Sequence, residues 1–138
     1  MLSISSKSKY GILAVLSLAA QYGQGLLQIK DLSSLNNIPQ QYLVQIFNLL
    51  VKADVIQSVR GKNGGYKLSR PPAAVTTLEV LEILEGGIDF MNERQVVADA
   101  IYDLFAQAET QLRNALKITL ADLLDRQQKK SMVPMFDI

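Results

Sequence analysis

Cysteine and histidine are both absent from this 138-residue sequence. Their absence excludes disulfides, thiolate nucleophiles, Cys–His zinc sites and imidazole general bases. The glycine-rich phosphate loops of P-loop and dinucleotide-binding proteins are missing as well. Carboxylate metal sites and Ser–Lys catalysis remain possible, but the spacing of these residues does not assemble such a site in a cleft. We therefore do not expect an enzyme.

Long hydrophobic runs are also lacking, since none reaches the roughly 18 residues that span a bilayer. The apolar stretch 11–20 is interrupted by Ser17 and has no small-residue cleavage site after it. Its spacing suits a buried helix better than a signal peptide, so we expect a cytoplasmic protein. With 49% hydrophobic and 20% charged residues, the chain should form one compact domain around a core.

The net charge of +1 conceals a division between the two halves of the chain. Residues 1–72 hold eight basic and two acidic side chains, a net charge of +6, whereas residues 73–138 hold six basic and eleven acidic ones, a net charge of −5. A basic half joined to an acidic half indicates that the first half meets a polyanion. The alternative is two oppositely charged faces with no ligand.

Three helices are expected in the first half of the chain. The first runs from about Ser5, where Ser5 or Ser6 caps it, to Tyr22, with Tyr10, Leu13, Leu16 and Ala20 at helical spacing. A short helix from Ile29 or Lys30 to Leu35 ends at Asn36-Asn37. Pro39 then opens a third helix that extends to about Ala53, with Tyr42, Leu43, Ile46, Leu49 and Leu50 on its apolar side. Two helices joined by a tight polar turn are typical of a helix-turn-helix, whose second helix enters the major groove of DNA.

A hairpin follows this unit directly. Val55–Val59 and Tyr66–Leu68 are strand-like, and Asn63-Gly64-Gly65 lies between them, where a turn requires the positive φ that Asn and Gly tolerate. Leu27–Ile29 either pairs as a minimal strand or leads straight into the second helix. The hairpin tip carries Arg60 and Lys62, so it is suited to the phosphate backbone or the minor groove.

The acidic half predicts helices separated by a connector. A helix capped by Thr76 or Thr77 should end at Gly86-Gly87, and a long helix should run from about Glu93 to Lys117, followed by a short one capped by Thr119. A long amphipathic helix outside a compact head needs a cover, and a second copy of the chain is the simplest one. The expected dimer-interface residues are Val97, Ile101, Leu104, Phe105, Ala108, Leu112 and Leu116.

The predicted fold class is mainly α with a small β-wing, a winged helix-turn-helix head plus a long C-terminal dimerisation helix. The expected divisions are a DNA-binding head at 1–72, a connecting helix and linker at 73–91, the dimerisation helix and final short helix at 92–126, and a mobile tail at 127–138. The carboxylates Glu79, Glu82, Glu85 and Asp89 recur near helical spacing; a solvated acidic face explains them better than a cation site.

Four segments of the chain resemble the Rrf-two family of winged-helix regulators, of the IscR, NsrR and CymR type. These are Ser6–Tyr10, Ile38–Phe47 (IPQQYLVQIF), Val59–Leu68 (VRGKNGGYKL) and Ile118–Leu123 (ITLADL). The similarity extends from Leu2 to about Gln127, and the wing segment is its most specific part. It implies a symmetric homodimer whose long helices cross and whose two heads read a pseudo-palindromic operator in double-stranded DNA.

The resemblance also implies roles for single residues. Gln41, Tyr42 and Gln45 match the part of the recognition helix that meets bases and phosphates, and Arg60 matches a wing arginine placed in the minor groove. The first helix of the family approaches the backbone with its N-terminal end. The candidate DNA-contacting residues are Lys7, Lys9, Gln40, Gln41, Tyr42, Val44, Gln45, Arg60, Lys62, Asn63, Gly64 and Gly65. Solvated glutamines, a core tyrosine and a merely solubilising hairpin are the alternatives.

Two departures from the family pattern matter. IscR has a glutamate at the position of Val44 that helps to set site discrimination, whereas Val44 offers only an apolar contact, for instance with a thymine methyl. Cluster-binding members carry cysteines in the connector, but here Gly86–Val97 reads GGIDFMNERQVV. Since thiolates are the usual ligands of iron–sulfur clusters, and Asp89, Glu93 or Asp99 would be poor ligands alone, we expect no cluster, metal or other cofactor.

The sequence predicts a homodimeric, sequence-specific regulator of transcription, either a repressor or an activator. Its signal is either a small-molecule effector, bound between the connector at Ile88–Met91 and the dimer helices, or a protein partner, as the resemblance to CymR suggests. The alternative function is a winged-helix module that binds a partner protein and has lost DNA binding. Arg60, Gly64, Gly65 and the charge of the first half argue against that alternative.

Overall fold

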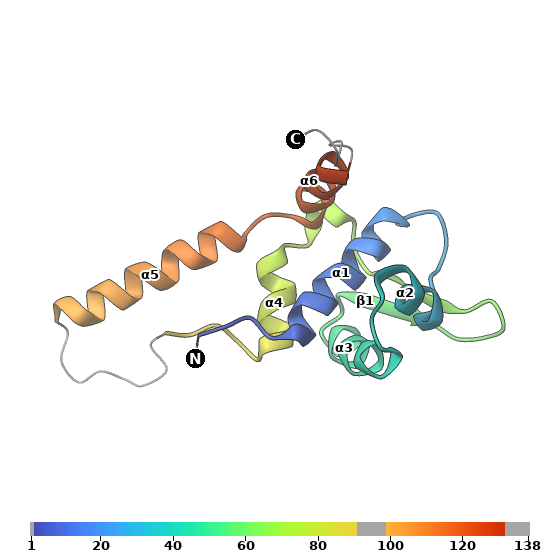
Figure 1. Ribbon diagram of the computed structural model, residues 1–138, viewed down its shortest axis with the longest axis horizontal. Helices are drawn as coiled ribbons and strands as arrows, with labels where there is room; N and C mark the ends of the chain where they lie inside the picture. The colour runs from blue at the N-terminus through green and yellow to red at the C-terminus, as the bar shows by residue number, and fades with distance from the viewer. Residues whose placement is uncertain (1, 91–98, 132–138) are drawn as a thin grey trace, which may run out of the picture.

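The computed structural model describes residues 2–90 and 99–131, and it is mainly helical with one small sheet (Figure 1). The elements in chain order are α1 (Ser6–Ala20), α2 (Ile29–Asn36), α3 (Gln40–Lys52), β1 (Ile56–Val59), β2 (Gly65–Leu68), the 3₁₀ turn η1 (Pro72–Ala74), α4 (Thr77–Glu85), α5 (Ala100–Leu116) and α6 (Leu120–Ser131). The predicted fold class, mainly α with a small β-wing, is confirmed. In the described part of the chain, no helix is long and apolar enough to cross a membrane.

Helix α1 runs through the middle of the head and packs against α3, α4, α6 and β2. Ser5 caps it as predicted, because the Ser8 amide donates to Ser5 Oγ at 3.2 Å. The predicted apolar stripe is partly wrong, since Leu13 is 36% exposed whereas Val15 and Leu18 are buried. Neighbours on several sides of α1 bury a wider face than a single stripe.

Helices α2 and α3 form the predicted helix-turn-helix. Asn37 makes the turn in a left-handed conformation, with φ of 53°, and the Ser33 hydroxyl donates to the Ile38 carbonyl. The buried side chains of α3 are Leu43, Ile46, Phe47 and Leu50. Tyr42 was expected on the apolar side, but it is 39% exposed, and the sequence interpretation missed Phe47.

The wing is an antiparallel pair in which Ile56 lies opposite Leu68 and Val59 opposite Gly65. Leu27 pairs with Tyr66 through hydrogen bonds of 3.1 and 2.8 Å, so this stretch does add a minimal strand. The predicted source of the turn is wrong: the positive φ lies at Gly61, at 118°, and not within Asn63-Gly64-Gly65.

Gly64 and Gly65 are needed instead for close approach of the backbone. A Cβ atom at residue 64 would lie 2.1 Å from the Val59 carbonyl oxygen, and one at residue 65 would lie 2.8 Å from the Leu27 carbonyl oxygen. Both distances are far below van der Waals contact. The two glycines therefore let the hairpin close and let Leu27 join it.

Helix α4 begins at the predicted cap, where the Glu79 amide donates to Thr76 Oγ1 at 3.1 Å, and ends at Gly86 with φ of 82°. Thr76 also pairs with Thr119, so the chain returns to the head after α5. Leu120, the first residue of α6, is fully buried in the core. The final helix thus packs on the head, although the sequence interpretation grouped it with the dimerisation helix.

Helix α6 continues through Ser131, into the segment 127–138 for which the sequence predicted a mobile tail. An Asp125–Lys129 pair at 3.0 Å lies along it, and Lys129 and Lys130 are in its last turn, where cations suit the helix dipole. The other residues of that predicted tail, 132–138, lie outside the described residues.

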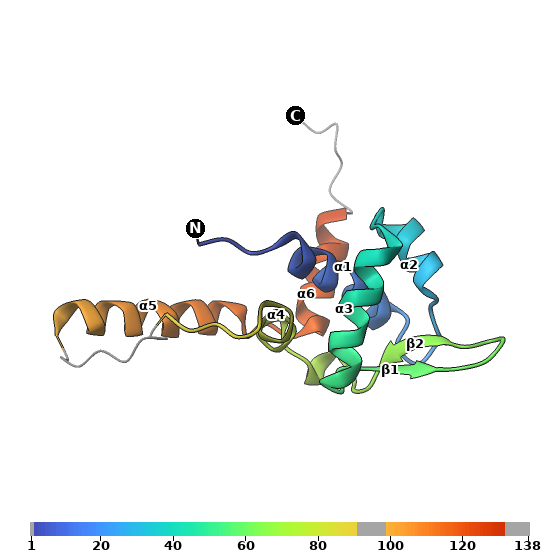
Figure 2. The same ribbon diagram turned by 90° about the horizontal axis from the view of Figure 1, so that it is seen from below.

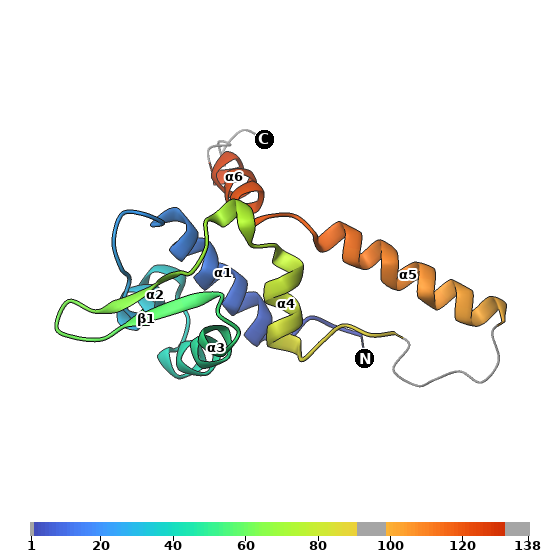
Figure 3. The same ribbon diagram turned by 180° about the vertical axis from the view of Figure 1, so that it is seen from behind.

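Helix α5 leads away from the head (Figures 1 and 3). Asp99 caps it, because the Tyr102 amide donates to Asp99 Oδ1 at 2.9 Å. Within the described range Ala100–Leu116, no residue is buried. The predicted start at Glu93 and the candidate interface residue Val97 lie outside the described residues.

Candidate nucleic-acid interface

The outer face of α3 carries all five candidate residues of the recognition helix. Gln40, Gln41, Tyr42, Val44 and Gln45 are exposed. Leu43, Ile46 and Leu50 on the opposite face are completely buried, which fixes the rotation of the helix about its axis. The core therefore determines which side chains α3 presents to a ligand.

The start of α1 lies beside this face of α3. The rings of Tyr10 and Tyr42 are 5.6 Å apart, centroid to centroid, and inclined by 55°. Lys7 is half-buried and Lys9 is exposed, three residues and one residue before Tyr10. This contact places the basic end of α1 next to the exposed glutamines of α3.

The wing extends from the head next to α2 (Figure 2). Arg60, Lys62 and Asn63 are exposed in its loop, while Gly64 and Gly65 are half-buried against the backbone. The Phe47 and Tyr66 rings, 4.7 Å apart between centroids, pack the wing against α3. The hairpin is thus held to the recognition helix, and its two cationic side chains are free to reach a polyanion.

The sequence interpretation missed two residues beside the wing loop, Gln28 and Lys30. Gln28 Nε2 donates to the Gly64 carbonyl at 3.4 Å, and Lys30 lines a hollow together with Lys62 and Asn63. The first helix of a helix-turn-helix crosses the DNA backbone. A lysine in the first turn of α2 was therefore a signal that could have placed Lys30 in the interface.

A carboxylate joins α4 to the start of α1. Glu85 Oε2 accepts from the Ser5 amide at 3.1 Å, from the Ser5 hydroxyl at 2.6 Å and from the Ser8 hydroxyl. These serine hydrogen bonds hold the pKa of Glu85 below its ordinary value, because they stabilise the ionised form. Ser8 is fully buried, so its hydroxyl acts within the protein.

A second polar cluster, which we call the Arg113 junction, joins α5 to α4. Arg113 Nη1 lies 2.8 Å from Glu82 Oε1, its Nε lies 3.2 Å from Glu109 Oε2, and its Nη2 donates to the Ile88 carbonyl. Glu109 Oε1 also accepts from the Phe90 amide at 2.7 Å. The Phe90 bond lowers the pKa of Glu109, and the bond to Glu109 raises that of Arg113.

The carboxylates of α4 are paired with other residues of the same chain. Glu79 pairs with Arg70 at 2.6 Å, Glu82 with Arg113, and Glu85 with the two serines. In the part of the chain that the structure describes, no group of three or more Asp, Glu, Cys or His residues is placed to hold a metal ion. Glu79, Glu82 and Glu85 are therefore engaged by three separate segments of the chain.

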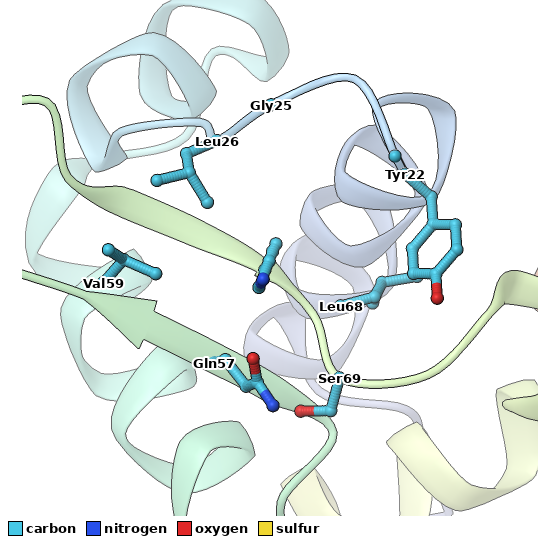
Figure 4. Close-up of a pocket in the computed structure, with 9 residues that line it drawn as sticks. Tyr22, Gly25, Leu26, Gln57, Val59, Leu68 and Ser69 are labelled. Atoms are coloured by element: carbon cyan, nitrogen blue, oxygen red, sulfur yellow. The ribbon is translucent and has the colours of Figure 1, made fainter.

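Two further hollows are lined by described residues outside α3. One lies beside the wing, where Tyr22 and Leu26 face Gln57 and Val59 (Figure 4). The other, of about 450 Å³, lies where the N-terminal segment, α4, the connector and α5 meet, and we call it the arm hollow. It is lined by Leu2, Ser3, Ile4, Leu81, Glu85, Gly87, Ile88, Asp89, Phe90, Leu112 and Leu116.

A family model described as "Iron-dependent Transcriptional regulator", Rrf2, matches residues 4–126. The chain belongs to the Rrf2 family. Its match covers the winged head, α5 and the first half of α6, so it includes every element that positions the face of α3 and the wing. The predicted family is confirmed.

Relatives of known fold agree over nearly the whole chain. The transcriptional regulator CymR of Bacillus subtilis is 30% identical over 135 residues, which cover 95% of this chain and 98% of CymR. A solved structure of B. subtilis CymR has a TM-score of 0.82 at 31% identity, covering 91% of this chain and 98% of that one. An IscR structure from T. potens has a TM-score of 0.81 at 29% identity, covering 98% of this chain and 95% of that one.

The Rrf2 membership has two direct consequences. The chain is a winged-helix, DNA-binding transcriptional regulator of a family with bacterial members. The family's members are regulators and not enzymes, which confirms the expectation drawn from the missing cysteine and histidine.

Proposed function

We propose that this Rrf2 regulator is a cytoplasmic homodimer that carries no iron–sulfur cluster. It binds a pseudo-palindromic operator. The observation that carries the proposal is the arrangement of α3, whose buried face fixes its rotation and leaves Gln41 and Gln45 exposed next to a basic wing. Glutamine amides pair bidentately with adenine, so Gln41 and Gln45 are the proposed base readers. Arg60 is proposed to enter the minor groove and Lys62 to contact the backbone.

The remaining candidates have positioning or backbone roles. Lys7, Lys9 and Lys30 are proposed to neutralise phosphates on either side of α3. Tyr42 is proposed to contact a phosphate with its hydroxyl, and Val44 a thymine methyl. Most of the affinity then comes from phosphate neutralisation, whereas the choice of sequence comes from α3 and Arg60.

The proposed dimer rests on the apolar face of α5. Ile101, Leu104 and Phe105 are 62%, 60% and 48% exposed on a helix that leads away from the head. Large apolar side chains clustered on one exposed helix are typical of an interface. Ala108, Leu112 and Leu116 continue the same face toward the head and are half-buried. A second copy of α5, crossing the first, covers this face.

The proposal excludes a cluster because of donor chemistry. Iron–sulfur clusters take thiolates or, in some types, imidazoles as ligands, and the whole sequence contains no cysteine and no histidine. The carboxylates in or beside the connector, Asp89, Glu93 and Asp99, would be poor ligands alone. The residues present therefore do not fit such a cluster.

The arm hollow is the proposed effector site. Its lining is largely aliphatic and aromatic, with Leu81, Ile88, Phe90 and Leu112 among its walls and the Glu85 carboxylate at its edge. An effector bound there would touch both α4 and α5, and so would act between the head and the dimer helix. Control by a protein partner is the competing input, and calorimetry with metabolite fractions against capture from lysate distinguishes the two.

The test is a titration of the purified protein with genomic fragments, including its own promoter, across a series of salt concentrations. We expect fragment-selective binding whose affinity falls steeply with salt, because counterions are released from each neutralised phosphate. Weak, equal binding to all fragments means that the reading state requires an effector. No binding at low salt contradicts the proposal and favours a module that binds a partner protein.

A further inference from the structure

The C-terminal half of α5 is tied to the head, whereas its N-terminal half carries the exposed apolar face. The tie is the Arg113 junction, which lies one turn before the end of α5. Beyond it, the chain re-enters the head through a hydrogen bond of 2.8 Å from the Thr77 amide to the Ile118 carbonyl. The direction in which α5 leaves the head is therefore decided at this end of the helix.

Arg113 contacts three separate segments at once. Its guanidinium reaches Glu82 on α4, Glu109 on its own helix and the Ile88 carbonyl in the connector, with the side chain 30% exposed. A guanidinium is a planar fork whose donors point in fixed directions, unlike the compact charge of a lysine. Because the three acceptors lie on different segments, satisfying all of them fixes the orientation of α5 relative to α4 as well as its distance.

Helix α4 is in turn fixed to the DNA-facing part of the head. One turn beyond Glu82, Glu85 accepts three hydrogen bonds from Ser5 and Ser8 at the start of α1. Tyr10, two residues after Ser8 on α1, touches Tyr42 on the recognition helix. A continuous series of contacts thus runs from α5 through α4 and α1 to α3.

This geometry has a consequence for a dimer, and the inference therefore rests on the proposed function. When two copies pair through α5, the angle between α5 and its head sets the distance and the relative rotation of the two α3 helices. One base pair added to an operator moves the half-sites apart by about 3.4 Å and rotates them by about 34°. If the angle between α5 and the head is rigid, the dimer binds operators with one half-site spacing. If that angle is flexible, the dimer binds operators with several spacings.

We propose that Arg113 is a positioning residue for specificity, which sets the spacing and rotational phase of the two half-sites that the dimer accepts. It does so through contacts within the chain and not through DNA, since its guanidinium is engaged by Glu82, Glu109 and the Ile88 carbonyl. The ion pairs of Arg113 are partly exposed and contribute modestly to folding stability, so loss of Arg113 should change the spacing rule more than the stability of the fold.

The experiment measures affinity as a function of spacer length for wild type and for Arg113→Met, which keeps the aliphatic stem. Three duplex types are used: an isolated half-site, the natural operator, and operators with one or two base pairs added or removed. For wild type we expect roughly a tenfold or greater loss of affinity when two base pairs are added, because the DNA must be twisted to fit. For Arg113→Met that loss should shrink to about threefold or less. The angle between α5 and the head then changes instead of the DNA being twisted.

Control variants separate this role from general damage. Arg126→Met removes an exposed arginine of α6 and should reproduce the wild-type spacer profile. Arg113→Lys keeps the charge but not the fork, so its profile should lie between those of wild type and Arg113→Met. Glu82→Gln removes the α4 carboxylate that pairs with Arg113. Its spacer profile provides the same test if Arg113→Met fails to fold.

For every variant we also measure the affinity for the isolated half-site and, by sedimentation, the oligomeric state. The proposal predicts that both are unchanged in Arg113→Met. A wild-type spacer profile in both Arg113→Met and Glu82→Gln overturns it, as does an equal loss of affinity on all duplexes, half-sites included. Failure of the proposed function looks different, because wild type itself would then be monomeric or would bind DNA without salt dependence.

Discussion

Arg60 is an exposed cation where β1 passes into the wing loop. Its truncation in Arg60→Ala should weaken operator binding by about 1–3 kcal/mol and relax base preference at the minor-groove position. Lys130→Ala, which removes an exposed cation at the far end of α6, is the control and should leave both unchanged. Competition titrations with operators altered at single positions make the measurement. Unchanged affinity and preference in Arg60→Ala would contradict the assignment of the wing.

Gly64 is a steric requirement, because a Cβ there would lie 2.1 Å from the Val59 carbonyl oxygen. Gly64→Ala should lower the free energy of unfolding by about 2 kcal/mol, since backbone rather than a flexible side chain must move. Ser58→Ala, on the neighbouring strand and exposed, should change it by less than about 0.5 kcal/mol. Urea unfolding compares the two variants, and equal stabilities would show that the hairpin tolerates a different loop.

Glu85 should make stability depend on acid. Its serine hydrogen bonds lower its pKa in the folded state, so the stability it contributes is complete above its ordinary pKa of 4.5 and is lost as the pH falls through the lower folded value. Glu85→Gln should therefore be less stable than wild type at pH 7, and the gap should narrow below about pH 4.5. Thermal melts between pH 3 and 7 test this, and a gap that stays constant would contradict it.

Local features of single residues could be predicted from the sequence, whereas their burial could not. Capping serine and threonine were placed correctly because a cap requires only the local chain. The burial of Ser8 was not foreseen, since its partner, Glu85, is 77 residues away. Tyr42 and Phe47 both fit an apolar stripe on α3, and only the position of α1 and β2 decides which one is buried. Tertiary contacts, not local pattern, made these choices.

Helix α5 carries the prediction that belongs to the scale of elements. Leu104→Glu places a charge in the middle of its exposed apolar face and should convert the protein to a monomer at micromolar concentration. Gln107→Glu introduces the same side chain at another exposed position of the same helix and should remain dimeric. Analytical ultracentrifugation separates the outcomes, with circular dichroism to show that both variants keep their helices. Two dimeric variants would mean that another surface holds the copies together.

Elements were easier to foresee than their ends. The helices of the head were predicted from local signals: caps at Ser5, Thr76 and Thr119, stop signals at Asn36-Asn37 and Gly86-Gly87, and apolar spacing. The end of α6 was not, because Gln127–Ser131 lacks apolar residues and reads as a polar tail. Charge pairing and the helix dipole support those residues in the helical state, and neither requires a buried face. Apolar spacing does not predict a helix end that has no buried face.

At the scale of the whole molecule, α6 belongs to the head although it is last in sequence. A chain ending at Lys117 lacks Leu120, which is fully buried, and the Thr76–Thr119 pairing. We expect that truncation to cost about 2–5 kcal/mol, comparable to removing a large core side chain. A chain ending at Ser131 keeps α6 whole and should unfold like the full chain. Denaturant unfolding of both truncations is the measurement, and equal stability would show that the head closes without α6.

The same placement of Leu120 governs the order of events during protein synthesis. The ribosome adds about 5–20 residues per second, so the roughly 50 residues from the end of the wing to Leu120 occupy several seconds. Throughout that interval the nascent head lacks the residue that completes its core, although α3 and the wing have already been made. Helix α5, the helix that pairs in the proposed dimer, is made before Leu120 completes the core of the head. In the proposed dimer, a newly made chain therefore has its dimerisation helix before its DNA-binding head is stable.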